Sequence, residues 1–455
     1  MTECTQECFE FAPAFSRRVV GQFDGEWMTS DGGGVLLRQT DRKINLLKRL
    51  VGCFSDHRDP ERVEHRLIEI LAQRIYGLAL GYEDLNDHEQ LRHDPLLALL
   101  AGKREVEEPL AGKSTLNRME RVPAEAGAAA EDRYHKITYS TEKLDALLVD
   151  VFLESHRQIP DQIVLDLDVT DTPLHGEQEA RFFHGYYGHY CYLPLYIFCG
   201  EHLLCARQRA SNQDASAGSL EEVERIVHRI RRRWPKVQII LRADSGFCRE
   251  ELMAWCEAHH VDYVFGLARN ERLEEEICEA LAEAKIQHES SGRPARRFRE
   301  FPYRTRHSWS RSRRVVAKAE HLPKGSNPRF VVTSLPAEAY AAQSLYEQLY
   351  CARGEMENRI KEQLGLFADR MSTESLRSNQ LRLYFSSFAY VLMHAFRRLG
   401  LAGTEMARVQ VGTIRLRLFK IAAEVRISVR RILLRYARAY PWKPLFASAW
   451  SALRC

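Results

Sequence analysis

The chain has 455 residues, of which 45% are hydrophobic and 28% are charged, and its formal net charge at pH 7 is +4. This is a globular composition, sufficient for two to four domains and a large core. It excludes a membrane-spanning helix, because no uninterrupted apolar run approaches the ~20 residues that such a helix needs. The eleven cysteines include no CxxC pair and the first residues lack a signal-peptide pattern, which favours a cytoplasmic protein with reduced thiols and no zinc site.

The first part of the chain, up to about residue 155, is predicted to be mainly helical after a polar start. Residues 41–54 and 63–82 carry apolar side chains at spacings of three and four, as an amphipathic helix requires. The glycine-rich stretch TSDGGGVLL, residues 29–37, lacks the Lys-Ser/Thr pair of a phosphate-binding loop, so we expect a plain turn there.

Short aliphatic runs that alternate with amphipathic helices begin near residue 160. Such alternation is typical of a mixed α/β domain. The predicted strands cover residues 162–170, 190–200, 202–210, 237–247 and 262–270, and the predicted helices cover 219–234 and 249–260.

The alternation stops at 270–340, which is predicted to be an insertion with its own strands. It contains an acidic stretch, 270–284, and an arginine-rich one, 293–314. A long helix is predicted over 337–365, and residues 375–440 are predicted to be helical, apolar and arginine-rich. From residue 382 to the end, fourteen lysines and arginines stand against two acidic residues. Basic blocks kept apart from acidic ones indicate a polyanionic partner, most simply nucleic acid.

Two aspartates occupy matching places in the predicted sheet. Asp168 and Asp244 each lie at the carboxyl end of an aliphatic strand, where open α/β sheets bind their ligands. A divalent cation would relieve the repulsion between them, and oxygen-only ligands suit Mg²⁺ or Mn²⁺. Asp166 shares the strand face of Asp168, because side chains alternate with period two, and it is the alternative first ligand. Asp171 is expected in a turn or cap.

Four polar residues form a stripe on the predicted long helix. Tyr350, Arg353, Glu357 and Lys361 stand at i, i+3, i+7 and i+11, so all four follow one helical face. The stripe is compatible with a functional surface that supplies a third carboxylate, and equally with an exposed ladder of salt bridges.

Three motifs, DLDVT, RADSGF and YCARGEMENRIKE, resemble those of DDE transposases of bacterial insertion sequences when taken in this order. Together with the run PLHGEQEARFFHGYYGHYCYLPLYIF, they are most similar to the insertion-sequence 1380 family. The resemblance implies an RNase H-like core with Asp168, Asp244 and Glu357 as catalytic, metal-binding triad. Asp168 is preferred over Asp166 because the first aspartate of the family precedes a threonine, here Thr170.

The resemblance also implies the chemistry and the partners. Two Mg²⁺ ions, which Mn²⁺ could replace, about 4 Å apart would support cleavage at transposon ends and joining of the 3′-hydroxyls to target DNA. The substrates would be double-stranded DNA with terminal inverted repeats and a target duplex, bound by a homodimer. Alternatives are a metal-dependent DNA nuclease of the same fold without strand transfer, and a non-catalytic DNA-binding protein derived from a transposase.

Several further residues are expected to contact DNA. Lys361 follows the glutamate more closely than in related families, which leaves a phosphate contact as its expected role. In RTRHSWSRSRR, Trp309 would hold a flipped base, with a tryptophan packed under the inserted strands as the alternative. The expected DNA-binding residues are Tyr350, Arg353, Lys361, Trp309, Arg311, Arg313 and Arg314.

The chain is thus expected to divide into five regions of an α/β fold. The RNase H-like core would be interrupted by the β-containing insertion and flanked by helical terminal regions. The regions are a DNA-binding N-terminal part, 1–155, the first part of the core, 156–269, the insertion, 270–340, the closing helices of the core, 341–395, and a basic helical C-terminal part, 396–455.

Overall fold

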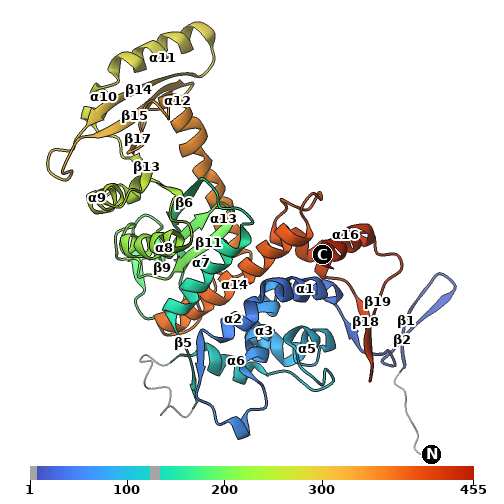
Figure 1. Ribbon diagram of the computed structural model, residues 1–455. Coiled ribbons are helices and arrows are strands. Elements are labelled where there is room, and N and C mark those ends of the chain that lie inside the picture. Colours follow the sequence, from blue (N-terminus) through green and yellow to red (C-terminus); the bar gives the residue numbers. More distant parts are fainter. Residues whose placement is uncertain (1–7, 123–133, 455) are drawn as a thin grey trace, which may run out of the picture. The chain divides into compact units, whose positions relative to one another are not determined.

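The computed structural model describes residues 8–122 and 134–454, and it is a mixed α/β structure (Figure 1). The chain divides into two compact units. The terminal unit consists of the described residues of Met1–Val51, Arg58–Asn117 and Ala395–Cys455, and the sheet unit consists of those of Gly52–His57 and Arg118–His394. No helix within the described ranges is long and apolar enough to cross a membrane.

A nine-stranded mixed sheet dominates the sheet unit. Its order is β11-β10-β6-β12-β13-β17-β15-β14, with β16 paired to β15. β6 runs parallel to β12, β12 runs parallel to β13, and the remaining pairs are antiparallel. The strands are β6 (Gln162–Val169), β10 (Leu195–Cys199), β11 (His202–Arg207), β12 (Gln238–Ala243), β13 (Asp262–Leu267), β14 (Ala295–Tyr303), β15 (Arg313–Leu322), β16 (Gly325–Ser326) and β17 (Arg329–Thr333).

The strands predicted in the 270–340 region are β15 and β17, and with β14 they extend this same sheet. β17 pairs with β13 of the preceding alternation, so the strands of the expected insertion belong to the same sheet as those before it. Helix α11 (Cys278–Ser291) lies against β14 and β15 (Figure 1).

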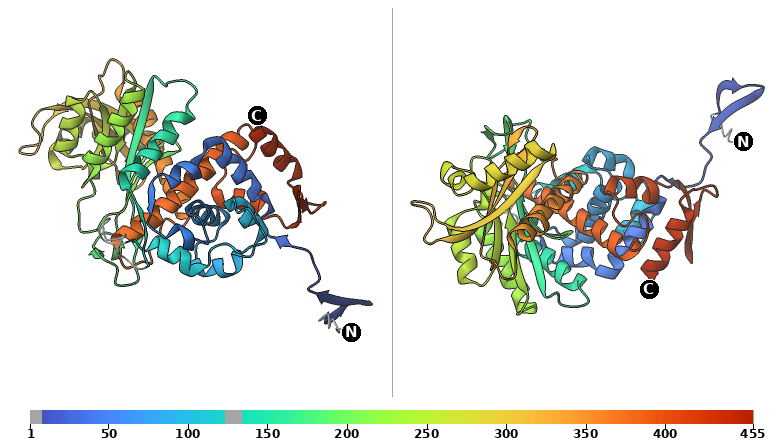
Figure 2. Two further views of the ribbon diagram at one scale, coloured as in Figure 1. Left: turned by 60° about the horizontal axis from the view of Figure 1, so that its bottom comes forward. Right: turned by 90° about the horizontal axis from the view of Figure 1, so that it is seen from above.

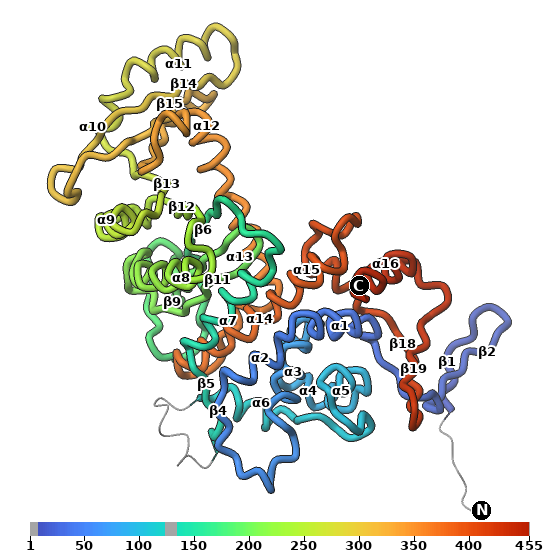
Figure 3. The backbone as a smooth tube through the Cα atoms, viewed as in Figure 1, coloured from blue at the N-terminus to red at the C-terminus, as the bar shows by residue number. Residues whose placement is uncertain are grey.

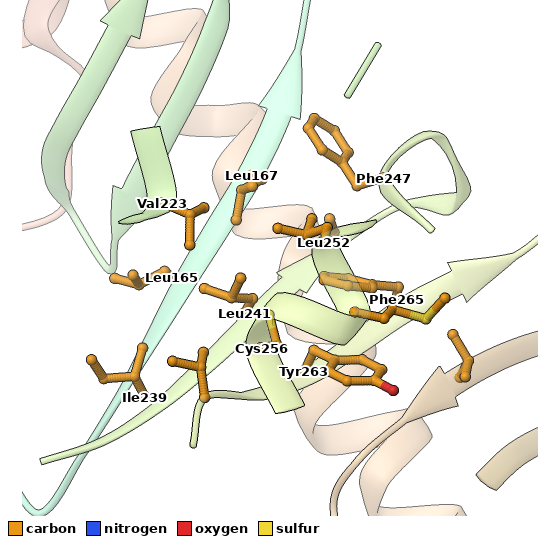
Figure 4. Close-up of a cluster of buried hydrophobic side chains, with 14 of the residues drawn as sticks. Leu165, Leu167, Val223, Ile239, Leu241, Phe247, Leu252, Cys256, Tyr263 and Phe265 are labelled. Atoms are coloured by element: carbon orange, nitrogen blue, oxygen red, sulfur yellow. The ribbon is translucent and has the colours of Figure 1, made fainter. Parts of the chain in front are cut away.

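The two faces of the sheet have separate cores, because side chains alternate along each strand. Ile163, Leu165 and Leu167 of β6 point into the larger core. Figure 4 shows Leu165 and Leu167 beside Ile239 and Leu241 of β12. This face is covered by α7 (Thr141–Ser155), α8 (Ser219–Arg233) and α9 (Glu250–Ala258).

The opposite face of the sheet packs against the long helical segment that follows β17. Val164 of β6 contacts a smaller core that includes Leu345 and Tyr346 of this segment. The segment does not wind uniformly, although the backbone coils onward without a break (Figure 3). It consists of α12 (Ala342–Ser344), a π-helical turn η6 (Leu345–Tyr350), a 3₁₀ turn η7 (Cys351–Arg353) and α13 (Gly354–Leu364).

In the terminal unit, the glycine-rich stretch is a short 3₁₀ helix, η1 (Gly32–Gly34), buried against backbone. The Gly32 amide donates to the carbonyl of Ile421 at 2.8 Å. A Cβ at Gly33 would lie 1.6 Å from the carbonyl oxygen of Leu418, so only glycine permits this approach. The helices of this unit include α1 (Val35–Ile44), α2 (Leu46–Val51), α3 (Leu67–Leu80), α5 (Pro95–Ala101) and α16 (Lys443–Arg454).

The C-terminal region differs from the predicted all-helical one. Residues 423–436 form a β-hairpin, β18 (Ala423–Ser428) and β19 (Arg431–Tyr436), which with β3 (Met28–Thr29) makes a three-stranded sheet. The sequence alternates buried Ala423 and Val425 with exposed Arg426, a period of two that suits a strand and not a helix.

The polar start of the chain holds a second hairpin, β1 (Cys8–Ala14) and β2 (Arg17–Gln22), which stands clear of the other elements of its unit (Figure 2). The long helix α14 (Leu376–Gly400) has residues in both units. The remaining elements are β4 (Phe54–Asp56), η2 (Pro60–Arg62), η3 (Leu85–Asp87), α4 (His88–Leu91), α6 (Lys113–Glu120), β5 (Ile137–Tyr139), β7 (Thr172–Pro173), β8 (Phe182–His184), β9 (His189–Tyr192), η5 (Ser245–Phe247), α10 (Glu271–Glu275), α15 (Val411–Ile414) and η8 (Arg415–Phe419).

Candidate active site

The carboxyl ends of β6 and β12 place Asp168 and Asp244 opposite each other. Leu167 pairs with Ala243 in the parallel register, so the residue that follows each of them is an aspartate. The Asp244 carboxylate caps the turn η5, where its Oδ1 accepts a hydrogen bond from the Gly246 amide at 2.8 Å. The strand register alone therefore brings together the two aspartates predicted from the sequence.

Burial and neighbouring charges shift the pKa of Asp168 in opposite directions. Burial raises the pKa of this carboxyl to about 6, against the lowering effects of the Arg353 guanidinium and of the Val169 amide, and the charge of Asp244 adds to the rise. Arg353 donates from Nη1 to Asp168 Oδ2 at 2.9 Å. The guanidinium thus neutralises part of the charge that two facing carboxylates would otherwise place in a half-buried site.

Arg353 connects the helical segment to both aspartates. Burial disfavours its charged form, yet the nearby Asp168, Tyr350, Asp244 and Glu357 raise its pKa above the ordinary value. Its side chain is 20% exposed, so part of it remains open to solvent. Such a group can bind a phosphate oxygen while it remains hydrogen-bonded to a carboxylate.

Tyr350 is positioned by a glycine that the sequence analysis did not identify. Gly266 of β13 follows Phe265, the register partner of Ala243, and therefore lies beside Asp244. A Cβ at Gly266 would stand 2.6 Å from the Tyr350 hydroxyl oxygen and 2.9 Å from the Ser245 amide nitrogen. The absent side chain lets the tyrosine hydroxyl reach the turn that carries Asp244. A glycine inside a strand is the sequence signal for such close approach.

Glu357 and Lys361 both lie on α13 and both are exposed. Among residues 8–122 and 134–454, no group of three or more His, Cys, Asp or Glu side chains is arranged to hold a metal ion. Asp168 and Asp244 offer the hard oxygen donors that Mg²⁺ or Mn²⁺ prefers, and so these two residues fit such an ion. Glu357 is close enough to influence Arg353 but does not complete a three-carboxylate group with them.

Asp166, the alternative first ligand, has a partner of its own. Both of its carboxylate oxygens accept hydrogen bonds from Arg242 of β12, at 2.5 and 2.8 Å, and both side chains are buried. Arg242 also donates to the carbonyl of Leu349 in η6 at 2.5 Å. This bidentate pair compensates the buried charge of Asp166 within the protein. Asp168, by contrast, lies next to the carboxyl end of the strand. Sequence reasoning missed Arg242.

The arginine-rich stretch that was expected to contact DNA is largely engaged within the protein. Trp309 is 4% exposed and packs edge-on against Tyr303, with ring centroids 5.8 Å apart. Trp309 is therefore packed within the protein, as in the alternative expected from the sequence, and its indole is not exposed to hold a flipped base. Arg313 is buried between Glu250 and Glu257 of α9, where four hydrogen bonds hold its guanidinium.

The neighbouring arginines also have acidic partners. Arg311 lies 3.1 Å from Glu257, and Arg314 bonds Glu300 and the carbonyls of Leu335 and Tyr340. The positive charge of these arginines is therefore matched by carboxylates of other elements, Glu250 and Glu257 of α9 and Glu300 of β14. Asp171, expected in a turn or cap, accepts a hydrogen bond from His189 at 2.8 Å.

The chain matches a known protein family. Residues 11–455 match the family model described as transposase DDE domain group 1. The match spans nearly the whole chain, and the chain therefore belongs to the DDE transposase family. No curated protein matches its sequence.

Proposed function

We propose that this chain is a DNA transposase of an insertion sequence, resembling the bacterial insertion-sequence 1380 family, that acts in the cytoplasm. It binds terminal inverted repeats, cleaves at the transposon ends and joins the freed 3′-hydroxyls to target DNA. The observation that carries the proposal is the pair Asp168 and Asp244 at the carboxyl ends of two adjacent parallel strands, with Arg353 bonded to the first.

An RNase H-like core is the fold that we propose for the centre of the sheet unit. Support comes from the mixed order β11-β10-β6-β12-β13, which places the two strands bearing the aspartates side by side in the same direction. The carboxyl edge of such strands is where ligands of α/β sheets bind.

The residues of this site have different proposed roles in metal binding, phosphate binding and positioning. Asp168 and Asp244 would hold divalent ions, Mg²⁺ or Mn²⁺, which when bound supply positive charge for in-line displacement at phosphorus. Glu357, which does not form a group with them in this structure, is the proposed third ligand of a two-ion site in the complex with DNA. Arg353, bonded to Asp168 and partly open to solvent, binds the phosphate next to the scissile bond. Tyr350, seated over Gly266, fixes the distance between the helical segment and the Asp244 turn.

The DNA itself requires a larger surface than these residues provide. Exposed Lys361 continues the helix beyond Glu357 and adds a phosphate contact. We assign recognition of the inverted repeats to the helices of residues 1–155 and further phosphate contacts to residues 396–455. Because two ends are processed together, the active form on DNA is a homodimer.

The test is cleavage of a labelled duplex that carries the end of the element, with Mg²⁺ or Mn²⁺ added. Asp168→Asn, Asp244→Asn and Glu357→Gln should each abolish cutting while DNA binding persists. Glu355→Gln, which changes an exposed glutamate on the same helix, is the matched control and should cut like the parent.

Three outcomes would change the assignment. Loss of cutting in Glu355→Gln alone would move the third carboxylate by two residues. Cleavage without joining to a target duplex would support the nuclease. A parent protein that binds the ends and never cuts would support a binding protein.

A further inference from the structure

We propose that the hairpin β18–β19 is a DNA-binding ribbon, whose exposed arginines contact the phosphates of duplex DNA along a groove. The inference rests on the proposed function for the identity of the polyanion. It deepens that function, because it assigns the phosphate contacts of residues 396–455 to one surface of the terminal unit, a hairpin where the sequence had indicated helices.

The two strands of the hairpin sort their side chains onto opposite faces. The antiparallel register runs without a shift from the pair Ala423 and Tyr436 to the pair Ser428 and Arg431. One face carries Ala423, Val425 and Tyr436. The two aliphatic residues are buried, and the Tyr436 ring lies 5.4 Å from that of Phe446 in α16. This face is anchored to its own unit.

The opposite face and the turn are basic. Between residues 423 and 438 there are five arginines and one acidic residue, Glu424, a surplus of four positive charges that equals the formal net charge of the entire chain. Glu424 pairs with Arg426 and lies 3.5 Å from Arg435, so it reduces the positive charge at the end of the hairpin away from the turn. Arg430 and Arg431, at the turn, are exposed.

The hairpin differs from the arginine-rich stretch at 304–314 in how many of its arginines form ion pairs with carboxylates. There, carboxylates from α9 and β14 surround the guanidiniums, and the charge is used to join elements of one unit. In the hairpin, the one carboxylate stands at the far end from the turn, where Arg430 and Arg431 remain exposed. Arginines displayed in this way suit bidentate contact with phosphate oxygens.

The shape of the ribbon also suits DNA. A two-stranded β-ribbon fits the major groove of a B-form duplex. β19 is the edge strand of its sheet, in the order β19-β18-β3, so within the described part of the chain its outer edge pairs with no other strand. Val429 at the turn is fully exposed and gives the tip an apolar surface next to the basic side chains of Arg430 and Arg431. An apolar tip of this kind can enter a groove while the adjacent arginines contact the phosphate backbone.

The experiment measures binding of the full chain to a fluorescein-labelled, mixed-sequence DNA duplex by anisotropy, without divalent metal, at several salt concentrations. The variant is Arg430→Gln/Arg431→Gln. The control is Arg232→Gln/Arg233→Gln, which removes two adjacent exposed arginines from the end of α8 in the sheet unit. Thermal unfolding of each protein verifies that its fold is kept.

We expect the hairpin variant to bind at least about tenfold more weakly than the control variant. Because each phosphate contact contributes about 0.9 to the slope of log K against log salt, the slope should fall by roughly two. An affinity and slope equal to those of the control variant would overturn the proposal, and so would a loss of affinity with an unchanged slope. Binding needs no cutting, so failure of the parent to cleave would count against the proposed function alone.

Discussion

Replacement of Asp166 by asparagine distinguishes a structural carboxylate, Asp166, from the proposed metal ligand, Asp168. Asp166 and Asp168 lie two residues apart on the same strand face, and either position could supply the first ligand by spacing alone. In the structure, Asp166 bonds Arg242 through both oxygens, whereas Asp168 faces Asp244 and Arg353. We expect Asp166→Asn to reduce stability strongly and Asp168→Asn to abolish cleavage.

The size of the stability loss follows from burial. The side chains of Arg242 and Asp166 are 9% and 7% exposed, so removal of the carboxylate charge leaves a guanidinium buried without its counter-charge. Breaking such a pair costs about 3–5 kcal/mol. Asp150 offers a matched control, because it also accepts two hydrogen bonds from one arginine, Arg229, but with side chains 30% and 29% exposed. Asp150→Asn should cost no more than about 1 kcal/mol.

Thermal unfolding measures the difference, and cleavage of the transposon-end duplex gives the second readout. At roughly 2 °C or more per kcal/mol, the melting temperature should fall by about 6 °C or more in Asp166→Asn and by about 2–4 °C or less in the control. Well below that temperature, Asp166→Asn should still cut DNA. If Asp166→Asn melts like Asp150→Asn and yet fails to cut, Asp166 is the metal ligand and our reasoning is refuted.

Three further results are expected. Gly266→Ala, which places a methyl group 2.6 Å from the Tyr350 hydroxyl oxygen, should cost about 1–3 kcal/mol in unfolding experiments and slow cleavage. Burial by itself raises the pKa of Glu250 and Glu257, but the hydrogen bonds and charge of Arg313, together with hydrogen bonds from Ser310 to Glu250 and from Tyr263 to Glu257, hold both below the ordinary value of 4.5. Their contribution to stability is present above that value and lost as pH falls through the lowered pKa values, so Arg313→Gln should flatten the acid limb of melting temperature against pH. Removal of divalent metal with EDTA should stop cutting and leave binding of the transposon-end duplex intact.

Each of these predictions has its own control. Gly354→Ala adds the same methyl group where nothing lies within 4 Å, and it should be neutral or slightly stabilising. A Gly266→Ala protein as stable as the parent would show that the tyrosine moves aside without cost. Arg306→Gln, at an exposed arginine of the same stretch as Arg313, should leave the acid limb unchanged. Equal acid limbs in parent and Arg313→Gln would contradict the ion-pair explanation. Loss of duplex binding with EDTA would mean that the metal holds DNA as well as supporting its cleavage.

The mixed α/β fold was predictable because its signals are local. The aliphatic runs that become β6 and β12 are short and bounded, and strands buried on both faces read in this way. The order of these strands in the sheet depends on contacts far apart in the sequence. An aspartate at the carboxyl end of each strand nevertheless predicts that Asp168 and Asp244 lie at the same edge of the sheet, where ligands bind. The roles assigned to Asp168, Asp244 and Glu357 in catalysis stay predictions.

What the sequence did not indicate depends on partners far along the chain. The charge of Arg313 is satisfied by Glu250 and Glu257, more than fifty residues earlier, and a count of nearby charges cannot show this. The 423–436 hairpin was predicted as helix because apolar and basic residues alternate in short runs that suit either period. Burial of the alternate residues Ala423 and Val425, with the contact between Tyr436 and Phe446 of α16, selects the strand. Tertiary packing decides such cases over local preference.

Arg242 also has a consequence for how related chains can vary. One guanidinium bonds the carboxylate of Asp166 in β6 and the carbonyl of Leu349 in the π-helical turn, so it joins a strand to the helix that carries Arg353. A change at Arg242 must be compensated at Asp166 at the same time, and the turn must find another donor. Among homologues we therefore expect positions 166 and 242 to change together, as a pair. Position 168 should instead remain aspartate whatever the pair becomes, since Asp168 bonds Arg353 and not Arg242, and its proposed role is to bind metal.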